Sequence, residues 1–453
     1  MAALTTDRER TAHLLRRFGL GSTEAELDFY SANGWRKAVD LLLEPPHDSS
    51  YETNWADLVN PSNGNLNTVA VQYAWYGQLL LSYHPLIERL ATFWHGHFAL
   101  SGSKVNNGFI AADYLGTLRR HALSPFPELL KAVCKSPAMI FWLDNQTNVA
   151  SSPNENLGRE VLELFTLGEG NFSEEDVREA ARALTGWSLQ RNRGNSQQPI
   201  SFLFRPGVHD DGPKTILGKT AAFDGESFLD HVAMQPQTAR YLVDKILRWF
   251  VQPNPSPQLV EKYSALYLES GLDTKQILRT IMVSDEFYGQ GSVRSVVKSP
   301  LDFAVAVPRQ LGLAALANEQ LKTSGEPRAV LAFGRPLAQA SSAMGMSLLF
   351  PEDVSGWDGG LAWISSSTMT ERIAWADTLF SPADGRGRTA VPVDWLEEKA
   401  SRLDETLLTI YDADLTEENR EAVAKVARAS GDLRERVITS TRLVFGAPEF
   451  QFC

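Results

Sequence analysis

Cysteine, positive charge and long hydrophobic runs are all scarce in this sequence of 453 residues. Its two cysteines, Cys134 in mid-chain and Cys453 at the last position, exclude a disulfide framework and a cysteine-based zinc site. The chain has 43 Lys and Arg against 55 Asp and Glu, a formal net charge of −12, which argues against sequence-independent binding to nucleic acid. The longest apolar stretch, at about residues 69–81, is interrupted by Gln72 and Gln78 and is too short to span a membrane.

A secretion signal is missing from the first residues, because Met1 to Leu14 are polar and charged rather than apolar. As given, the sequence therefore indicates a cytoplasmic protein. A mature exported protein whose signal has been removed stays an alternative. Hydrophobic residues make up 43% of the chain, which is enough for a substantial core and excludes an intrinsically disordered protein.

Apolar residues recur mainly with the helical period of about 3.6 residues, whereas the alternation typical of β-strands is rare. Hydroxyl residues followed by acids, at 173–176 and 416–418, match helix starts. Strand-like segments at 200–204 and 215–217 flank a loop rich in Gly, Pro and Asp. The sequence thus predicts a mainly α, multi-helix globular fold with a small β-hairpin insertion near residues 200–218. The expected helices cover about residues 68–98, 109–122, 127–133, 156–167, 174–184, 237–250, 257–269, 273–283, 302–313, 369–376, 394–410 and 417–430.

Two parts are expected along the chain. Residues 1–300 form a main helical domain that carries the His and Glu motifs and the hairpin, and residues 301–453 form a C-terminal helical part packed on it. A loop-like stretch at about 289–299 separates the two parts. The chain shows no repeat of fixed period, which argues against a solenoid.

The first candidate for chemistry is the pair His95-Gly96-His97. In a continuous helix these two rings point about 200° apart, because each residue turns the helix by about 100°. At a helix end or in an extended segment they can converge on one metal ion. Three interpretations stay open: metal ligation, catalysis without a metal, and packing in an aromatic core.

The second candidate is a helical face that carries Asn156, Arg159, Glu160 and Glu163. In one interpretation this face is solvated, with an Arg159–Glu163 pair at i,i+4. In the other it points inward, and two carboxylates one turn apart bind a divalent cation or carry out acid–base catalysis. We take Glu160, Glu163 and Arg159 as the catalytic candidates.

The third candidate is the loop that begins with His209 and Asp210, which is either a solvated turn or a presented binding site. Imidazoles and carboxylates together suit Mn, Fe or Zn, so a divalent metal is the suspected cofactor. The candidate metal ligands are His95, His97, Glu160, His209 and Asp210.

Tryptophan rings near these motifs either hold loops on the core or stack on a substrate such as a sugar. The clearest case is Trp357, which lies in a glycine-rich loop at 354–360. A small molecule, a glycan or a peptide would be the substrate. The candidate substrate-binding residues are Asn156, Arg182, Trp187 and Trp357.

Several ordered segments together resemble the domain-of-unknown-function-1800 family of bacterial proteins. The resemblance covers nearly the whole chain, from about residue 10 to 380 and again near the C-terminal tail. The chain departs from the family pattern at 345–346 and 351–353. The segments that carry the resemblance are 13–19, 93–98, 136–139, 143–145, 154–168, 175–187, 209–218, 354–357 and 448–450.

This family is uncharacterised, and its members commonly resemble exported proteins encoded beside a sulfatase-like family. The resemblance thus implies a sulfatase-like protein as a partner. From the residues, the preferred hypothesis is a metal-dependent enzyme, a hydrolase or an iron-type oxidase, with a His/Glu/Asp site. The alternatives are a metal-free glycan-active enzyme with paired carboxylates and a non-enzymatic helical scaffold.

Overall fold

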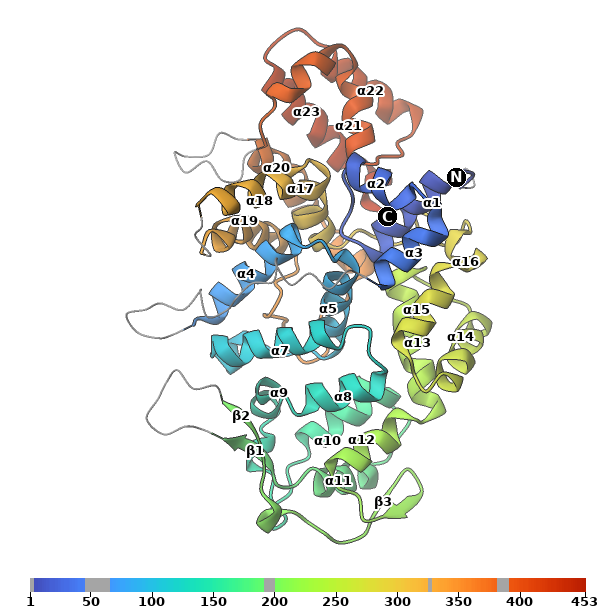
Figure 1. The fold of residues 1–453 in the computed structure, drawn as a ribbon, viewed down its shortest axis with the longest axis vertical. Helices are drawn as coiled ribbons and strands as arrows, with labels where there is room; N and C mark the ends of the chain where they lie inside the picture. The colour runs from blue at the N-terminus through green and yellow to red at the C-terminus, as the bar shows by residue number, and fades with distance from the viewer. Residues whose placement is uncertain (1–3, 45–65, 191–199, 325–327, 381–390) are drawn as a thin grey trace.

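Helices build most of the chain in this computed structural model, which describes residues 4–44, 66–190, 200–324, 328–380 and 391–453. Within these ranges the strands form two antiparallel two-stranded sheets (Figure 1). The predicted fold class, mainly α with a small hairpin region, is confirmed. None of the helices in these ranges is long and apolar enough to cross a membrane.

The helices follow one another with short connections along the chain. In the first half they are α1 (Asp7–Phe18), α2 (Glu24–Ser31), α3 (Trp35–Leu43), α4 (Thr68–Leu81), α5 (Pro85–His97), α6 (Gly102–Val105), α7 (Gly108–Arg120), α8 (Phe126–Cys134), α9 (Pro137–Trp142), α10 (Asn156–Glu160), the π-helix η3 (Val161–Leu167), α11 (Glu174–Ala183) and α12 (Gly225–Ala233). In the second half they are α13 (Pro236–Phe250), α14 (Pro257–Glu269), α15 (Thr274–Met282), α16 (Asp285–Tyr288), the π-helix η5 (Asp302–Ala306), α17 (Val307–Gln310), α18 (Leu313–Ser324), α19 (Ala329–Ala343), α20 (Ser366–Phe380), η7 (Asp394–Arg402), α21 (Leu403–Ile410), α22 (Glu417–Ala427) and α23 (Leu433–Gly446).

Start signals in the sequence explain where helices begin. Ser173 caps α11: its hydroxyl accepts the Asp176 N–H at 3.2 Å, and the Asp176 carboxylate accepts the Ser173 N–H at 2.9 Å. Such a reciprocal pair satisfies two backbone donors that the first helical turn leaves free. Thr416 also precedes a helix, α22, but its side chain makes no capping bond there.

The strands are where the sequence places them, but their partners differ from the expectation. Strand β2 (Ser201–Phe204) pairs with β1 (Trp187–Gln190), while β3 (Lys214–Ile216) pairs with β4 (Lys219–Ala221). The expected pairing of 200–204 with 215–217 is therefore wrong. The physical reason is the two-residue turn after β3, because Leu217 and Gly218 both have positive φ (49° and 76°) and such turns join adjacent strands directly.

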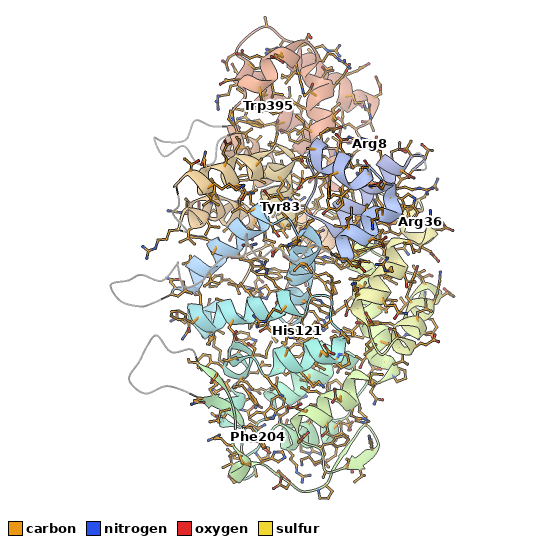
Figure 2. The ribbon with its side chains drawn as sticks, viewed as in Figure 1. Arg8, Arg36, Tyr83, His121, Phe204 and Trp395 are labelled. Carbon is orange, nitrogen blue, oxygen red and sulfur yellow. The ribbon has the colours of Figure 1, made fainter. Side chains whose placement is uncertain are left out.

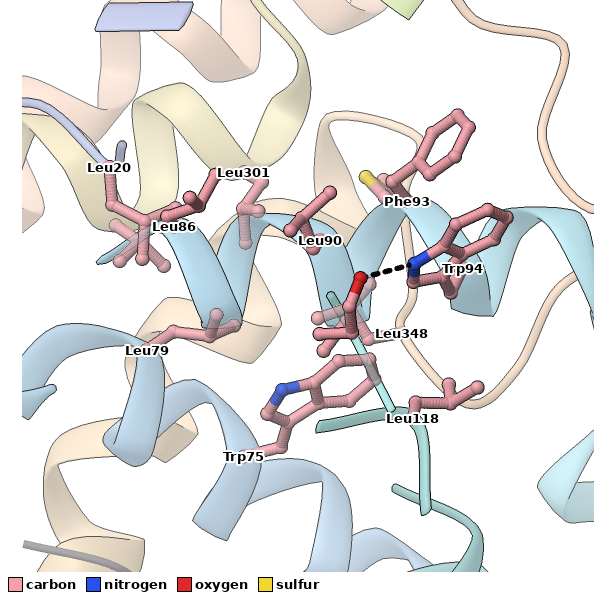
Figure 3. Close-up of a cluster of buried hydrophobic side chains, with 14 of the residues drawn as sticks. Leu20, Trp75, Leu79, Leu86, Leu90, Phe93, Trp94, Leu118, Leu301 and Leu348 are labelled. Carbon is pink, nitrogen blue, oxygen red and sulfur yellow. Dashed lines mark hydrogen bonds between the residues drawn. The ribbon is translucent and has the colours of Figure 1, made fainter. Parts of the chain in front are cut away.

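Helix α5 runs through the centre of the hydrophobic core. Leu86 and Leu90 of α5 face Leu79 of α4, and Trp94 lies farther along the same helix (Figure 3). The buried Trp94 indole donates its N–H to the Ala122 carbonyl at 3.1 Å, so this large ring enters the core with its polar group satisfied.

The core extends from the first helix to the last one. Buried apolar residues from Leu14 to Phe450 belong to one contiguous cluster, and α19 packs along α4. The C-terminal helices α21, α22 and α23 lie together at one end of the molecule, and the two small sheets lie at the opposite end (Figure 1). The division at about residue 300 stays a prediction.

Candidate functional site

The histidines of the first candidate motif lie on opposite sides of α5, because the helix continues through Gly96 and ends at His97. The His95 ring is fully buried and its Nε2 accepts the Leu349 N–H at 3.0 Å. Around it lie the rings of Trp75, Tyr114 and Trp357. Burial lowers the pKa of His95 to about 3, so this imidazole is neutral and serves as an acceptor in the core.

His97 faces the other way, toward η3 and α13. Its Nε2 lies 3.1 Å from the Phe165 carbonyl, and its Nδ1 lies 3.3 Å from Nζ of Lys245. Because a carbonyl can only accept, Nε2 carries the proton and Nδ1 offers a lone pair to the amine. Burial, followed by the charge of Lys245, holds the pKa of His97 well below its usual value.

Lys245 comes from the middle of α13 and is half-buried. Its Nζ lies 4.5 Å from the centre of the Tyr241 ring, one helical turn earlier. No carboxylate in the described ranges lies within ion-pair distance of this amine, although Asp244 is near enough to act on it electrostatically. Burial lowers the pKa of Lys245 to about 8, so a substantial share of this side chain is neutral near physiological pH.

The two carboxylates of the second motif lie next to this amine pocket. Glu160 ends α10, and Glu163 lies in the π-helix that follows without a break. Burial, with the negative charge of Glu163 as a second cause, raises the pKa of Glu160 to about 7. Glu163 also adds to the effect of burial that raises the pKa of Tyr241 to about 12. Glu163 thus acts electrostatically on both Glu160 and Tyr241, and we call His97, Glu160, Glu163, Tyr241 and Lys245 the amine–carboxylate cluster.

A π-helix is rare and is often found at functional sites, because its wider turn changes the direction of side chains. In η3 the Thr166 hydroxyl donates to the Val161 carbonyl, five residues earlier, at 2.6 Å. The next residue after η3, Gly168, has a φ of 80°, and a Cβ at this position would lie 3.0 Å from the Tyr241 ring. The end of η3 therefore approaches the cluster closely, at a position that favours glycine.

Two other residues of the second motif point away from the cluster. Arg159 binds Glu174 at 2.8 and 2.9 Å and Glu155 at 3.2 Å. The predicted alternative of an Arg159–Glu163 pair is therefore wrong, since α11 supplies the acidic partner instead. Asn156 is exposed at the start of α10.

The third motif forms a different network, at the corner between α11 and β3. Nδ1 of His209 lies 2.9 Å from the Thr185 carbonyl, and Asp210 binds Arg182 at 2.7 and 3.1 Å. Arg182 also binds Glu179, at 2.8 and 2.9 Å. Each charged group here has a partner from the neighbouring segment, so the contacts fix the loop on α11.

The predicted tryptophan platforms are enclosed by protein. Trp187 is 3% exposed and packs on Phe202, and a Cβ on Gly225 would lie 2.3 Å from its indole. Trp357 is half-buried, with its ring 5.4 Å from the ring of His95. Trp187 in particular presents little surface on which a ligand could stack.

The structure does not gather the five candidate metal ligands in one place. His95 and His97 face opposite sides of α5, and His209 and Asp210 belong to the corner beside β3. In the described part of the chain, no three His, Cys, Asp or Glu side chains are grouped so that they could hold a metal ion.

Lys245 and Tyr241 are absent from the sequence-based candidates. The helix that carries them is predicted, but one lysine on its polar side resembles any solvated lysine. A spacing of i,i+4 between an aromatic residue and a lysine is the one local sign of their contact. The partner His97 is 148 residues away in the sequence, which no local pattern shows.

A separate groove of about 1530 Å³ lies between α1, α2, α18, η7 and α21. Arg8 and Trp395 both line it, and they lie toward the same end of the molecule (Figure 2). Trp395 is 40% exposed and Leu316 is 37% exposed. No member of the amine–carboxylate cluster lines this groove.

Comparison with known proteins gives a family but no activity. No curated protein and no solved structure matches the chain. The family described as protein of unknown function (DUF1800) matches residues 13–452. With nearly its whole length matched, this chain belongs to the DUF1800 family of uncharacterised proteins.

Proposed function

We propose that this chain is an enzyme whose acid–base groups are those of the amine–carboxylate cluster. The observation that carries the proposal is the contact of 3.3 Å between Nζ of Lys245 and Nδ1 of His97, made without a carboxylate counter-ion in the described ranges. A structural lysine in a protein interior is normally ion-paired. An amine that is held only by a neutral imidazole and an aromatic ring is suited to give up its proton and act as a base.

Glu160 supplies the complementary group. A carboxyl whose pKa lies near 7 is partly protonated at neutral pH, so Glu160 can donate a proton while Lys245 accepts one. Glu163 remains the neighbouring charge that keeps the proton on Glu160. This proposal keeps the predicted catalytic carboxylates, adds Lys245 as their partner, and describes proton transfer on a small polar substrate, as in a hydrolase.

The metal-dependent form of the hypothesis ranks below this one, because its candidate ligands come from separate sites on the molecule. The glycan-active form shares the carboxylates Glu160 and Glu163 with our proposal. It loses Trp187 as a sugar platform, because that ring is buried.

A substrate panel tests the proposal. Esters, amides, glycosides and hydroxy acids are incubated with the wild-type protein, Glu160→Gln and Lys245→Met. General acid–base groups contribute roughly 10²–10⁴-fold, so an activity found in the wild type should fall by about that factor in both variants. The matched control is Lys262→Met, which removes an exposed lysine paired with Glu286 on α16. An activity that survives in both cluster variants contradicts the proposal.

A second candidate function, a scaffold that binds a partner protein, is favoured by the groove between α1, α18 and α21. Its exposed Trp395 and Leu316 are the kind of side chains that form the centre of protein interfaces. The test is complex formation with a sulfatase-like protein from the same bacterium, followed by light scattering. Leu316→Glu should abolish the complex, whereas Leu443→Glu, an equally exposed leucine outside the groove, should not. Equal effects of the two variants would contradict this function.

A further inference from the structure

We propose that Lys245 is a nucleophile, and that its amine captures a neutral aldehyde as an imine. This inference rests on the proposed function, because it assigns a substrate class to the same cluster. It starts from the position of the amine. Nζ of Lys245 lies between the imidazole of His97 and the face of the Tyr241 ring, on a side chain that is half-buried rather than enclosed.

The other lysines in the described ranges differ from Lys245 in ways that matter for reactivity. Lys104 and Lys262 are ion-paired with Asp144 and Glu286. Lys214 donates to two backbone carbonyls, at 2.5 and 2.9 Å. Such contacts favour the ammonium form, which has no lone pair and cannot attack a carbonyl carbon.

Lys298 is the closest comparison, because it also lies in the interior. It is 7% exposed, however, and its Nζ lies 3.2 Å from the centre of the Phe450 ring. A ligand would have to open the core to reach it. Lys245 combines a largely desolvated amine with a side chain that solvent still reaches, and this combination makes it the nucleophile of choice.

His97 orients the amine for attack. Its Nε2–H is fixed on the Phe165 carbonyl, so its Nδ1 lone pair accepts one N–H of Lys245 and directs the remaining positions of the amine. His97 is thus a positioning residue. The Tyr241 ring then faces the nitrogen, where its π electrons stabilise the positive charge of a protonated imine.

The reaction balances without an oxidant or a reductant. The lone pair of Nζ forms a bond to the aldehyde carbon, and the electron pair of the C=O bond moves to oxygen, which takes up a proton to give a carbinolamine. Loss of the second N–H proton and departure of the hydroxyl with one added proton release water and leave a C=N bond. Glu160, which is partly protonated near neutral pH, is the acid in the cluster that can supply the proton to the leaving hydroxyl.

Charge selects the substrate class. Asp244 acts electrostatically on Lys245, and Glu163 acts on the adjacent Tyr241. Arg248, one turn after Asp244, is paired with it at 2.7 Å. A keto acid would bring its own carboxylate toward these acidic groups, which is unfavourable in a partly buried site. A neutral aldehyde brings no such charge.

Reductive trapping tests the inference with the full chain. The protein is incubated with glycolaldehyde and cyanoborohydride at pH 7, and peptides are analysed by mass spectrometry. We expect the reduced adduct on Lys245 at least ten times as fast as on Lys262 or Lys298, and no adduct at this position in Lys245→Arg. Glyoxylate, the anionic analogue, should react more slowly. His97→Phe, which keeps a ring at the position, should slow trapping of Lys245 and leave Lys262 unchanged.

Labelling of Lys245 no faster than of Lys262 would overturn the inference, and faster trapping of glyoxylate would overturn the substrate class. The result is separable from that of the substrate panel. An activity lost in Glu160→Gln without any Lys245 adduct supports the acid–base function and contradicts the nucleophile. An adduct on Lys245 together with an activity untouched by Glu160→Gln supports the nucleophile and contradicts the acid–base function.

Discussion

His97 and Phe165 connect two helices that lie far apart in the sequence: Nε2 of the imidazole at the end of α5 donates to the Phe165 carbonyl of η3 at 3.1 Å. The π-helix ends at Leu167, so the Phe165 carbonyl is one of the last in that helix, where intrahelical donors run out. The bond satisfies this carbonyl and fixes the tautomer of His97, and through the tautomer it fixes the contact with Lys245.

His97→Phe should therefore destabilise the fold as well as alter the cluster. The ring volume is kept, but a buried carbonyl loses its donor, which costs roughly 1–3 kcal/mol of the free energy of unfolding. Urea unfolding measures the loss. The control is His121→Phe, whose half-buried ring contacts Ser124 near the surface and should change stability by no more than about 0.5 kcal/mol. Equal losses in the two variants would show that the Phe165 bond has no special weight.

Glu160 makes the stability of the protein depend on pH. Its folded-state pKa of about 7 lies above the unfolded value of 4.5, so the folded protein holds this proton more tightly. The resulting stabilisation is present at low pH and is lost as the pH rises from about 4.5 through 7. Because solvent reaches the carboxyl, we expect a loss of roughly 1–2 kcal/mol, less than the full conversion of the pKa shift.

Glu160→Gln should remove this component. Urea unfolding at pH 5 and pH 8 measures the difference between wild type and variant, and Glu169→Gln, an exposed glutamate just beyond η3, is the control. If Glu160→Gln keeps the whole pH dependence of the wild type, then Glu160 is not the group that titrates near neutrality.

The helices could be predicted because the apolar period is a local property of the sequence. The fate of the His95-Gly96-His97 motif could not, because it depends on whether α5 stops before or after Gly96. The helix continues to His97, so the two rings point into different parts of the core. A helix that ended earlier would have been needed to bring them together.

Contacts between distant segments set the remaining limit. The sequence marks 200–204 and 215–217 as strands, but it does not show that each has a nearer partner. It also marks the helix of Lys245, yet the lysine has meaning only beside His97 and Tyr241. The carboxylates Glu160 and Glu163 were found because they are close together on one helical face.

The buried ion pair between Arg89 of α5 and Asp302 of η5 should be essential for the fold. The pair is 2.8 Å long, and the second carboxylate oxygen of Asp302 accepts the Ser299 N–H and hydroxyl at 2.7 and 2.9 Å. Asp302→Ala leaves a buried guanidinium unpaired, so we expect a loss of about 3–5 kcal/mol in the free energy of unfolding. Asp377→Ala removes an exposed partner of Arg442 and should cost about 1 kcal/mol or less. Similar losses in thermal or urea unfolding would contradict the prediction.

The contact between α4 and α19 gives the sharpest test of packing, because Gly77 and Gly334 meet there without side chains. A Cβ on Gly334 would lie 1.7 Å from the Tyr73 carbonyl oxygen and 2.7 Å from the Gly77 amide nitrogen. Both are backbone atoms, so relief requires the two helices to move apart and opens the core that they share. Gly334→Ala should therefore cost roughly 3 kcal/mol or more, although alanine is the better helix former.

Gly207→Ala is the matched control, since nothing lies within 4 Å of a Cβ at that position. It should change the free energy of unfolding by no more than about 0.5 kcal/mol. Urea unfolding of the two variants, with soluble yield as a second readout if Gly334→Ala does not fold, decides between them. Near-equal stability would mean that α4 and α19 are farther apart in solution, and that the core does not continue across this contact.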